Sequence, residues 1–151
     1  MKSFNNIGLK KEISNALNEM GFIMPTPIQT KAIPHLMTSN QDIIASAQTG
    51  TGKTAAFGLP SIHLSEIKGK SPQTLIMCPT RELCIQIARD LSNFSKYLSD
   101  LKIVAVYGGA SVDSQIRALR QGAHIVIGTP GRTHDLIRRS KLSLLNIRRV
   151  V

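Results

Sequence analysis

One short segment constrains the fold of this chain more than any other. Residues 47–54 read Ala-Gln-Thr-Gly-Thr-Gly-Lys-Thr and follow an apolar run at 43–45. Glycines in such a loop let backbone N–H groups surround an anion, and a helix that starts directly after the loop presents its positive end to that anion. This context of strand, loop and helix predicts a phosphate-binding loop in an α/β protein.

The side chains of the loop suggest how a nucleotide is held. Lys53 is expected to face the β- and γ-phosphates, and Thr54 to offer its hydroxyl to Mg²⁺. Ala47 replaces the usual first glycine, so a surface loop rich in glycine and threonine stays open as an alternative on this segment alone. The predicted nucleotide contacts are Thr49, Gly50, Thr51, Gly52, Lys53 and Thr54.

The remaining sequence alternates between helical and strand-like patterns, which favours an α/β fold with a mostly parallel sheet flanked by helices. Helices are expected over 9–20, 27–37, 54–67, 81–97, 112–121 and 130–139. Strands are expected over 42–47, 74–78, 102–107, 124–128 and 147–151. Thr80 and Thr129 each precede a predicted helix, and each is expected to cap it.

The charge of the chain is consistent with a nucleic-acid partner. The formal net charge is +10, and from residue 117 onward eight Lys or Arg residues accompany a single acid, Asp135. A basic surface of this kind attracts phosphates, although solvated helix faces explain most of these arginines equally well.

Composition also narrows the cellular context. No apolar stretch approaches the length of a membrane span, and the first six residues lack the apolar run of a signal peptide. We therefore expect a cytoplasmic protein without a membrane partner. The two cysteines and four histidines show no metal-ligand spacing, so we expect free thiols and no zinc site.

Several short motifs accompany the loop in a fixed order. They are Phe4, Gly-Phe-Ile-Met-Pro-Thr-Pro-Ile-Gln at 21–29, Pro-Thr-Arg-Glu-Leu at 79–83, Gly108-Gly109 and Thr-Pro-Gly-Arg at 129–132. Together with the loop, this set closely resembles the first RecA-like domain of the DEAD-box RNA helicases over essentially the whole chain. The resemblance implies that residues 1–151 form part of that domain, with an adenine-recognition helical segment at 1–38 and a P-loop α/β core at 39–151.

The resemblance assigns the base to two residues. The amide of Gln29 can both donate and accept, as adenine N6 and N7 require, and the flat ring of Phe4 suits stacking on a base. In the family these two residues read adenine, which implies ATP as the nucleotide. Each has a plain alternative when it stands alone, namely a solvent-facing helix residue for Gln29 and a packing contact with the first helix for Phe4.

The resemblance also implies that RNA is contacted at the ends of three predicted strands. The residues concerned are Pro79, Thr80, Arg81, Gly108, Gly109, Thr129, Pro130, Gly131 and Arg132. Helix caps and a glycine turn are the structural alternatives at these positions. Contacts of this kind reach phosphate and ribose rather than base edges, so binding is expected to be independent of sequence and sensitive to salt.

The chain departs from the family pattern in one respect. It contains neither an Asp-Glu-Ala-Asp segment nor a Ser-Ala-Thr motif, and no second RecA-like domain. We therefore expect the N-terminal part of an ATP-dependent RNA helicase that binds ATP and RNA weakly. It is not expected to hydrolyse ATP, because no second apolar strand ends in a carboxylate to organise Mg²⁺ and water. The alternatives are another class of P-loop ATPase and a natural short binding module.

Overall fold

The computed structural model describes residues 3–151 and contains two compact units. Unit 1 comprises the described residues up to Leu64 together with Asp90–Ser99, and unit 2 comprises Ser65–Arg89 and Asp100–Val151. The phosphate loop belongs to the same unit as the N-terminal helices.

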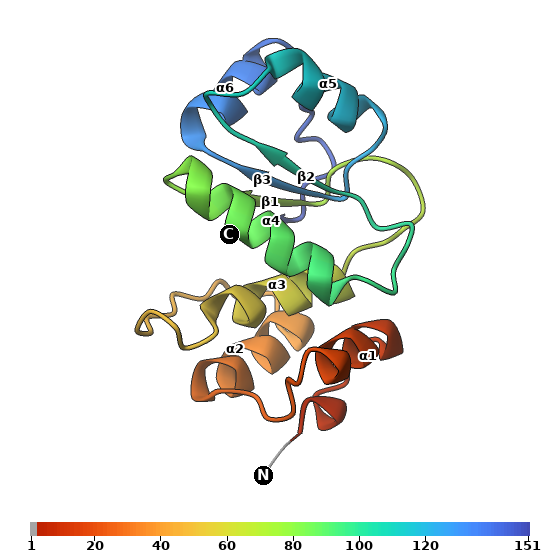
Figure 1. Cartoon of the computed structure of the whole chain (residues 1–151), viewed down its shortest axis with the longest axis vertical. Helices are drawn as coiled ribbons and strands as arrows, with labels where there is room; N and C mark the ends of the chain where they lie inside the picture. The colour runs from red at the N-terminus through yellow and green to blue at the C-terminus, as the bar shows by residue number, and fades with distance from the viewer. Residues whose placement is uncertain (1–2) are drawn as a thin grey trace. The chain divides into compact units, whose positions relative to one another are not determined.

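Unit 2 is built on a parallel sheet, as predicted (Figure 1). Its strands are β1 (Thr74–Met77), β2 (Ile103–Val106), β3 (Ile125–Gly128) and β4 (Arg149–Val150). They are ordered β2-β3-β1-β4, and every neighbouring pair is parallel. Parallel neighbours require crossovers, which is why helical segments separate these strands in the sequence.

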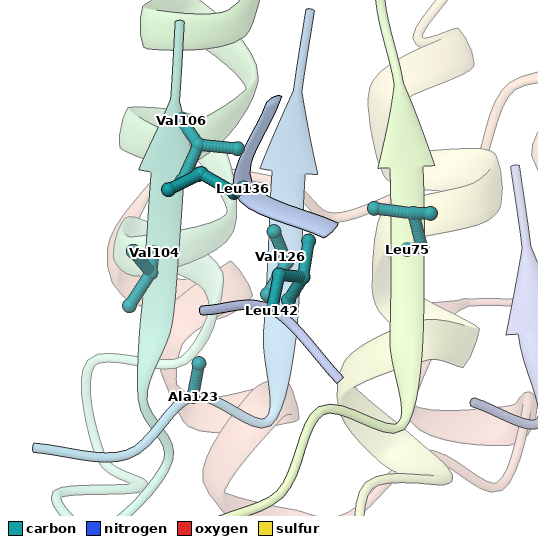
Figure 2. Close-up of a cluster of buried hydrophobic side chains, with 7 residues drawn as sticks. All are labelled: Leu75, Val104, Val106, Ala123, Val126, Leu136 and Leu142. Atoms are coloured by element: carbon teal, nitrogen blue, oxygen red, sulfur yellow. The ribbon is translucent and has the colours of Figure 1, made fainter. Parts of the chain in front are cut away.

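The core of unit 2 forms between the sheet and two helices, α5 (Val112–Arg120) and α6 (Pro130–Arg138), which cover one face of it (Figure 1). Figure 2 shows the buried side chains at its centre, which are Leu75, Val104, Val106, Ala123, Val126, Leu136 and Leu142. Because side chains alternate along a strand, every second apolar residue of the predicted strands reaches this core.

Unit 1 is helical. It contains a short 3₁₀ turn η1 (Phe4–Asn6) and the helices α1 (Lys11–Glu19), α2 (Pro27–Thr38) and α3 (Lys53–His63). The helix α4 (Arg81–Phe94) begins in unit 2 and ends in unit 1. Helices α2 and α3 pack against each other, which brings the start of α2 to the phosphate loop.

The end of α1 follows its sequence signal. Gly21 adopts a φ of 77°, which glycine tolerates without a steric penalty. Its N–H donates to Asn18 O at 3.1 Å, and the N–H of Phe22 donates to Leu17 O at 2.8 Å. This pair of bonds is a Schellman motif, in which backbone groups after the helix satisfy its last carbonyls.

The predicted strand at 42–47 was wrong. This segment forms neither helix nor strand, and the side chain of Ile44 is fully exposed at 103%. A strand exists only where a neighbour accepts and donates its backbone hydrogen bonds, and none of the four strands pairs with this segment. The apolar pattern was therefore necessary for a strand but not sufficient.

Other boundaries differ from the predicted ones by a few residues. Helix α3 ends at His63 rather than at Ile67, and α4 ends at Phe94 rather than at Tyr97. None of the helices within residues 3–151 combines the length and the apolar character that crossing a membrane requires.

Candidate nucleotide loop and nucleic-acid interface

The predicted phosphate loop leads directly into α3. Gly52 is the N-cap of α3 and has a φ of 85°, while Gly50 has a φ of 82°. Both values lie in the left-handed region that disfavours other residues, so the loop uses its two glycines for their backbone freedom. Lys53 and Thr54 form the first turn of the helix, where unpaired N–H groups point at an incoming anion.

The loop side chains donate to carbonyl groups of the loop itself. Lys53 Nζ donates to Ala47 O at 2.5 Å and to Gln48 O at 3.0 Å. The hydroxyl of Thr51 donates to the same Gln48 O at 2.7 Å. Phosphate oxygens would have to replace these carbonyls as acceptors, so nucleotide binding is expected to rearrange the loop.

Gln29 joins α2 to the loop through both ends of its amide. Its Nε2 donates to Gly52 O at 3.0 Å, and its Oε1 accepts from Thr26 N at 2.9 Å. Gln29 is only 1% exposed, so the alternative of a solvent-facing helix residue was wrong. Thr26 adds a second link, because its hydroxyl donates to Thr51 O at 2.8 Å.

The link through Gln29 also has a local sequence signature. Thr26 and Gln29 form a capping box at the start of α2, for which a threonine followed three residues later by glutamine is the known signature. The same amide that was assigned to adenine therefore also fixes the start of a helix. Its proximity to the loop supports a place for Gln29 at the nucleotide, while its contact with the base stays a prediction.

Phe4 lies in the core of unit 1. It is 1% exposed, and its ring packs edge-on against Phe22 with 6.4 Å between the centroids. Phe22 in turn packs edge-on against Phe94 at 6.0 Å. Neither face of the Phe4 ring is open to a base in this arrangement, so stacking on adenine stays a prediction that requires the ring to move.

The candidate RNA residues of unit 2 lie at the carboxyl edge of the sheet, which is formed by the C-terminal ends of its strands. Strand register places Met77 and Val106 each opposite Gly128, at the carboxyl ends of three adjacent strands. The segments that follow these strands therefore leave the sheet together, at the edge where α/β proteins bind their ligands. The structure brings together the three motifs that are far apart in the sequence: 79–83, 108–109 and 129–132.

Arg81 is held against the turn that follows β2. Its Nη1 donates to Gly109 O at 3.3 Å, and its guanidinium carbon lies 5.2 Å from the centre of the Tyr107 ring. Thr80 precedes it as the predicted helix cap, because the Thr80 hydroxyl accepts from Leu83 N at 3.3 Å. Arg81 is exposed to solvent as a residue.

Arg132 is fixed from two sides. Its Nη1 donates to Gln115 Oε1 at 2.9 Å, and its Nη2 donates to Ala110 O at 3.1 Å. Thr129 occupies the N-cap of α6 in extended conformation but makes no side-chain cap bond, so the expected hydroxyl cap was wrong. The helix starts through the backbone instead, where Thr129 O accepts from Thr133 N at 3.0 Å.

Two free thiols donate hydrogen bonds to backbone carbonyl groups of β3. Cys84 Sγ donates to Ile127 O at 3.2 Å, and Cys78 Sγ donates to Gly128 O at 3.6 Å. Burial raises the pKa of Cys78 and raises the pKa of Cys84 to about 12. Both cysteines are free and buried, as predicted.

Comparison with known proteins matches this arrangement to one family. A family model described as DEAD/DEAH box helicase matches residues 26–151. The chain is 48% identical over 142 residues to the ATP-dependent RNA helicase DeaD of Escherichia coli (strain K12), covering 94% of this chain and 22% of that protein. It is 47% identical over 149 residues to the protein of the same name from Buchnera aphidicola subsp. Acyrthosiphon pisum (strain APS), covering 99% of this chain and 25% of that one.

Solved structures agree with the sequence matches. The crystal structure of a DEAD box protein from the hyperthermophile Methanococcus jannaschii superposes with a TM-score of 0.92 at 41% identity, covering 98% of this chain and 40% of that chain. The chain thus spans about a quarter of the length of the curated relatives that it matches.

Proposed function

Because the chain belongs to the DEAD/DEAH box helicase family, we propose that it binds ATP through residues 47–54 and RNA through the carboxyl edge of its sheet. ATP-driven unwinding of RNA duplexes is proposed for a protein of the length of its relatives, with a second RecA-like domain as the partner of this one. The observation that carries the proposal is the convergence of three separate motifs on one edge, with two arginines already held in place.

For the nucleotide, the loop offers the chemistry that a triphosphate needs. Gly50 and Gly52 give the loop its left-handed backbone, and the start of α3 adds its positive end. Lys53 exchanges the carbonyls of Ala47 and Gln48 for phosphate oxygens. Gln29 lies against the same loop and supplies the amide that selects adenine.

For the metal, the hydroxyl of Thr54 fits Mg²⁺. This ion keeps several of its waters and is usually bound by one or two protein oxygens together with the phosphates of the nucleotide. Within residues 3–151 there is no group of three or more His, Cys, Asp or Glu side chains that could hold a metal alone. Mg²⁺ is therefore proposed to bind with ATP rather than before it, and to neutralise charge on the phosphates.

For hydrolysis, the ends of the strands matter. The residues that directly follow β1, β2 and β3 are Cys78, Tyr107 and Thr129, none of which is acidic. ATPases with a phosphate loop need a carboxylate at a strand end to organise Mg²⁺ and the attacking water. We therefore propose that this chain alone binds ATP without hydrolysing it.

For RNA, the arginines favour backbone contacts. Arg81 and Arg132 each bond a carbonyl of the turn after β2, which orients their guanidinium groups for phosphate oxygens. Thr80 and Thr129 directly precede α4 and α6, whose N-terminal ends favour an anion. None of these groups is arranged to read bases in a groove.

The salt dependence of RNA binding tests this part of the proposal. Two labelled single-stranded RNAs of unrelated sequence are titrated with the chain over a series of salt concentrations. We expect equal affinities for both, and we expect Arg81→Ala and Arg132→Ala each to lower the slope of log K against log salt by about 1. Arg138→Ala is the matched control, because this side chain is 74% exposed and pairs with Asp135 on the same helix. A difference in affinity between the two RNAs, or an affinity for RNA that does not change with salt concentration, contradicts the proposal.

A further inference from the structure

A buried glutamine lies at the centre of the candidate RNA edge. Gln115 belongs to α5, outside every motif that the sequence singled out, and is only 6% exposed. Its amide spans the turn after β2: Nε2 donates to Tyr107 O at 3.1 Å, and Oε1 accepts from Tyr107 N at 3.3 Å. A side chain that pairs with both backbone groups of one residue fixes that residue's peptide planes.

The same Oε1 also accepts from Arg132 Nη1 at 2.9 Å. Because Arg132 Nη2 donates to Ala110 O at 3.1 Å, its guanidinium is clamped between α5 and the turn that contains Gly108 and Gly109. Two of its N–H groups donate in this clamp, which leaves further donors on the same guanidinium. An arginine held this way needs little ordering when it meets a phosphate.

The turn itself connects the clamp to the third motif. Tyr107 carries the guanidinium of Arg81 over its ring at 5.2 Å, and Gly109 O accepts from Arg81 Nη1 at 3.3 Å. Displacing the turn would therefore move two carbonyl groups at once: Gly109 O, which accepts from Arg81, and Ala110 O, which accepts from Arg132. Gln115 is the buried side chain that ties this turn to α5.

We propose that Gln115 is a positioning residue for RNA, which sets the turn at 107–110 and the Arg132 guanidinium in the orientation that receives the RNA backbone. It does not touch RNA itself. This inference rests on the proposed RNA binding of this edge, and it assigns to Gln115 the task of coupling the motifs at 108–109 and 129–132.

The test is a set of matched variants of the whole chain. Gln115→Met keeps a similar length but has no amide, and Gln121→Met makes the same change at an exposed position of the same segment. Arg132→Lys keeps the positive charge but lacks the planar fork that reaches both Gln115 and Ala110. Each is titrated against a short fluorescein-labelled single-stranded RNA by anisotropy over a salt series, and its fold is checked by circular dichroism and thermal melting.

Positioning and charge predict different results. We expect Gln115→Met to weaken binding about three- to tenfold, the effect of one lost hydrogen bond of ordinary net strength, with the salt slope unchanged. Arg132→Lys should give a similar loss and an unchanged slope, whereas Arg132→Ala should lower the slope. In the Arg132→Ala background, Gln115→Met should cause a smaller further loss, because Arg132 is gone and only the contact of the turn with Arg81 still depends on Gln115. Gln121→Met should bind like the unaltered chain.

Several results would overturn the inference. If Gln115→Met binds RNA as tightly as the unaltered chain while Arg132→Ala does not, RNA binding stands and positioning by Gln115 fails. An equal loss from Gln115→Met with and without Arg132 would show that Gln115 does not act by positioning Arg132. If Gln115→Met does not fold, Arg132→Lys provides the test. Unaltered RNA affinity in Arg132→Lys would show that RNA binding does not require the hydrogen bonds of Arg132 to Gln115 and Ala110. No RNA binding by the unaltered chain refutes the proposed function together with this inference.

Discussion

Substitution of Gly52 by alanine tests how the loop and Gln29 are interlocked. A Cβ at this position would lie 2.2 Å from Gln29 Nε2 and 3.2 Å from its Cδ, and the backbone φ is 85°. Gly50 has a similar φ of 82°, but a Cβ there would meet nothing within 4 Å. The two alanine variants therefore share the backbone penalty and differ in the collision with the amide.

The expected magnitudes follow from this difference. A left-handed alanine costs about 1–2 kcal/mol, which is the whole effect expected of Gly50→Ala. In Gly52→Ala the amide must also leave Gly52 O, and an unsatisfied buried polar group costs a further ~1–3 kcal/mol. Urea unfolding of both variants, followed by circular dichroism, measures the two losses. Equal destabilisation by Gly50→Ala and Gly52→Ala would refute the claim that Gln29 is wedged against the loop.

Three further predictions follow from single groups. Gln29→Ala should weaken ATP binding by ~1–3 kcal/mol and abolish the preference for ATP over GTP, measured by competition with a fluorescent nucleotide; an unchanged ratio would remove Gln29 from the base. Burial, with a smaller effect of the Lys10 charge, lowers the pKa of His63 below its ordinary value of 6.5. The unfolded chain therefore binds the proton first, so urea midpoints should be constant above about pH 6.5 and fall as the pH drops below it, and His63→Gln should flatten this dependence. Because burial raises the pKa of Cys78 and Cys84, Ellman's reagent should label them only after unfolding; rapid labelling of the folded chain would contradict their place in the core.

The parts of the fold that depend on local pattern were predicted correctly. The strands at 74–77, 103–106 and 125–128 are apolar runs between helical patterns, and the structure pairs them in parallel as that alternation requires. The segment at 42–47 has the same local character but no partner, and its exposure shows that strand formation is decided by contacts far along the chain. A single sequence does not reveal such contacts.

In the candidate site, too, local features were predicted correctly and those that depend on distant contacts were not. The glycines of the loop and the cap at Thr80 were recognised because their roles are set by neighbours in the sequence. Gln115 was missed, because its partners Tyr107 and Arg132 lie 8 and 17 residues away and the polar character of its helix gave no hint of burial. Phe4 was assigned to a ligand on the resemblance, whereas its ring is 1% exposed in the core.

We propose that residues 47–54 bind ATP and that this chain alone does not hydrolyse it. Equilibrium binding of ATP and GTP, with phosphate release followed in the same samples in the presence of Mg²⁺ and RNA, tests both halves at once. We expect binding that favours ATP, its loss in Lys53→Ala, and no phosphate release from either chain. Undiminished ATP binding by Lys53→Ala would contradict the role of the loop, and phosphate release that disappears in Lys53→Ala would contradict the need for a carboxylate at a strand end.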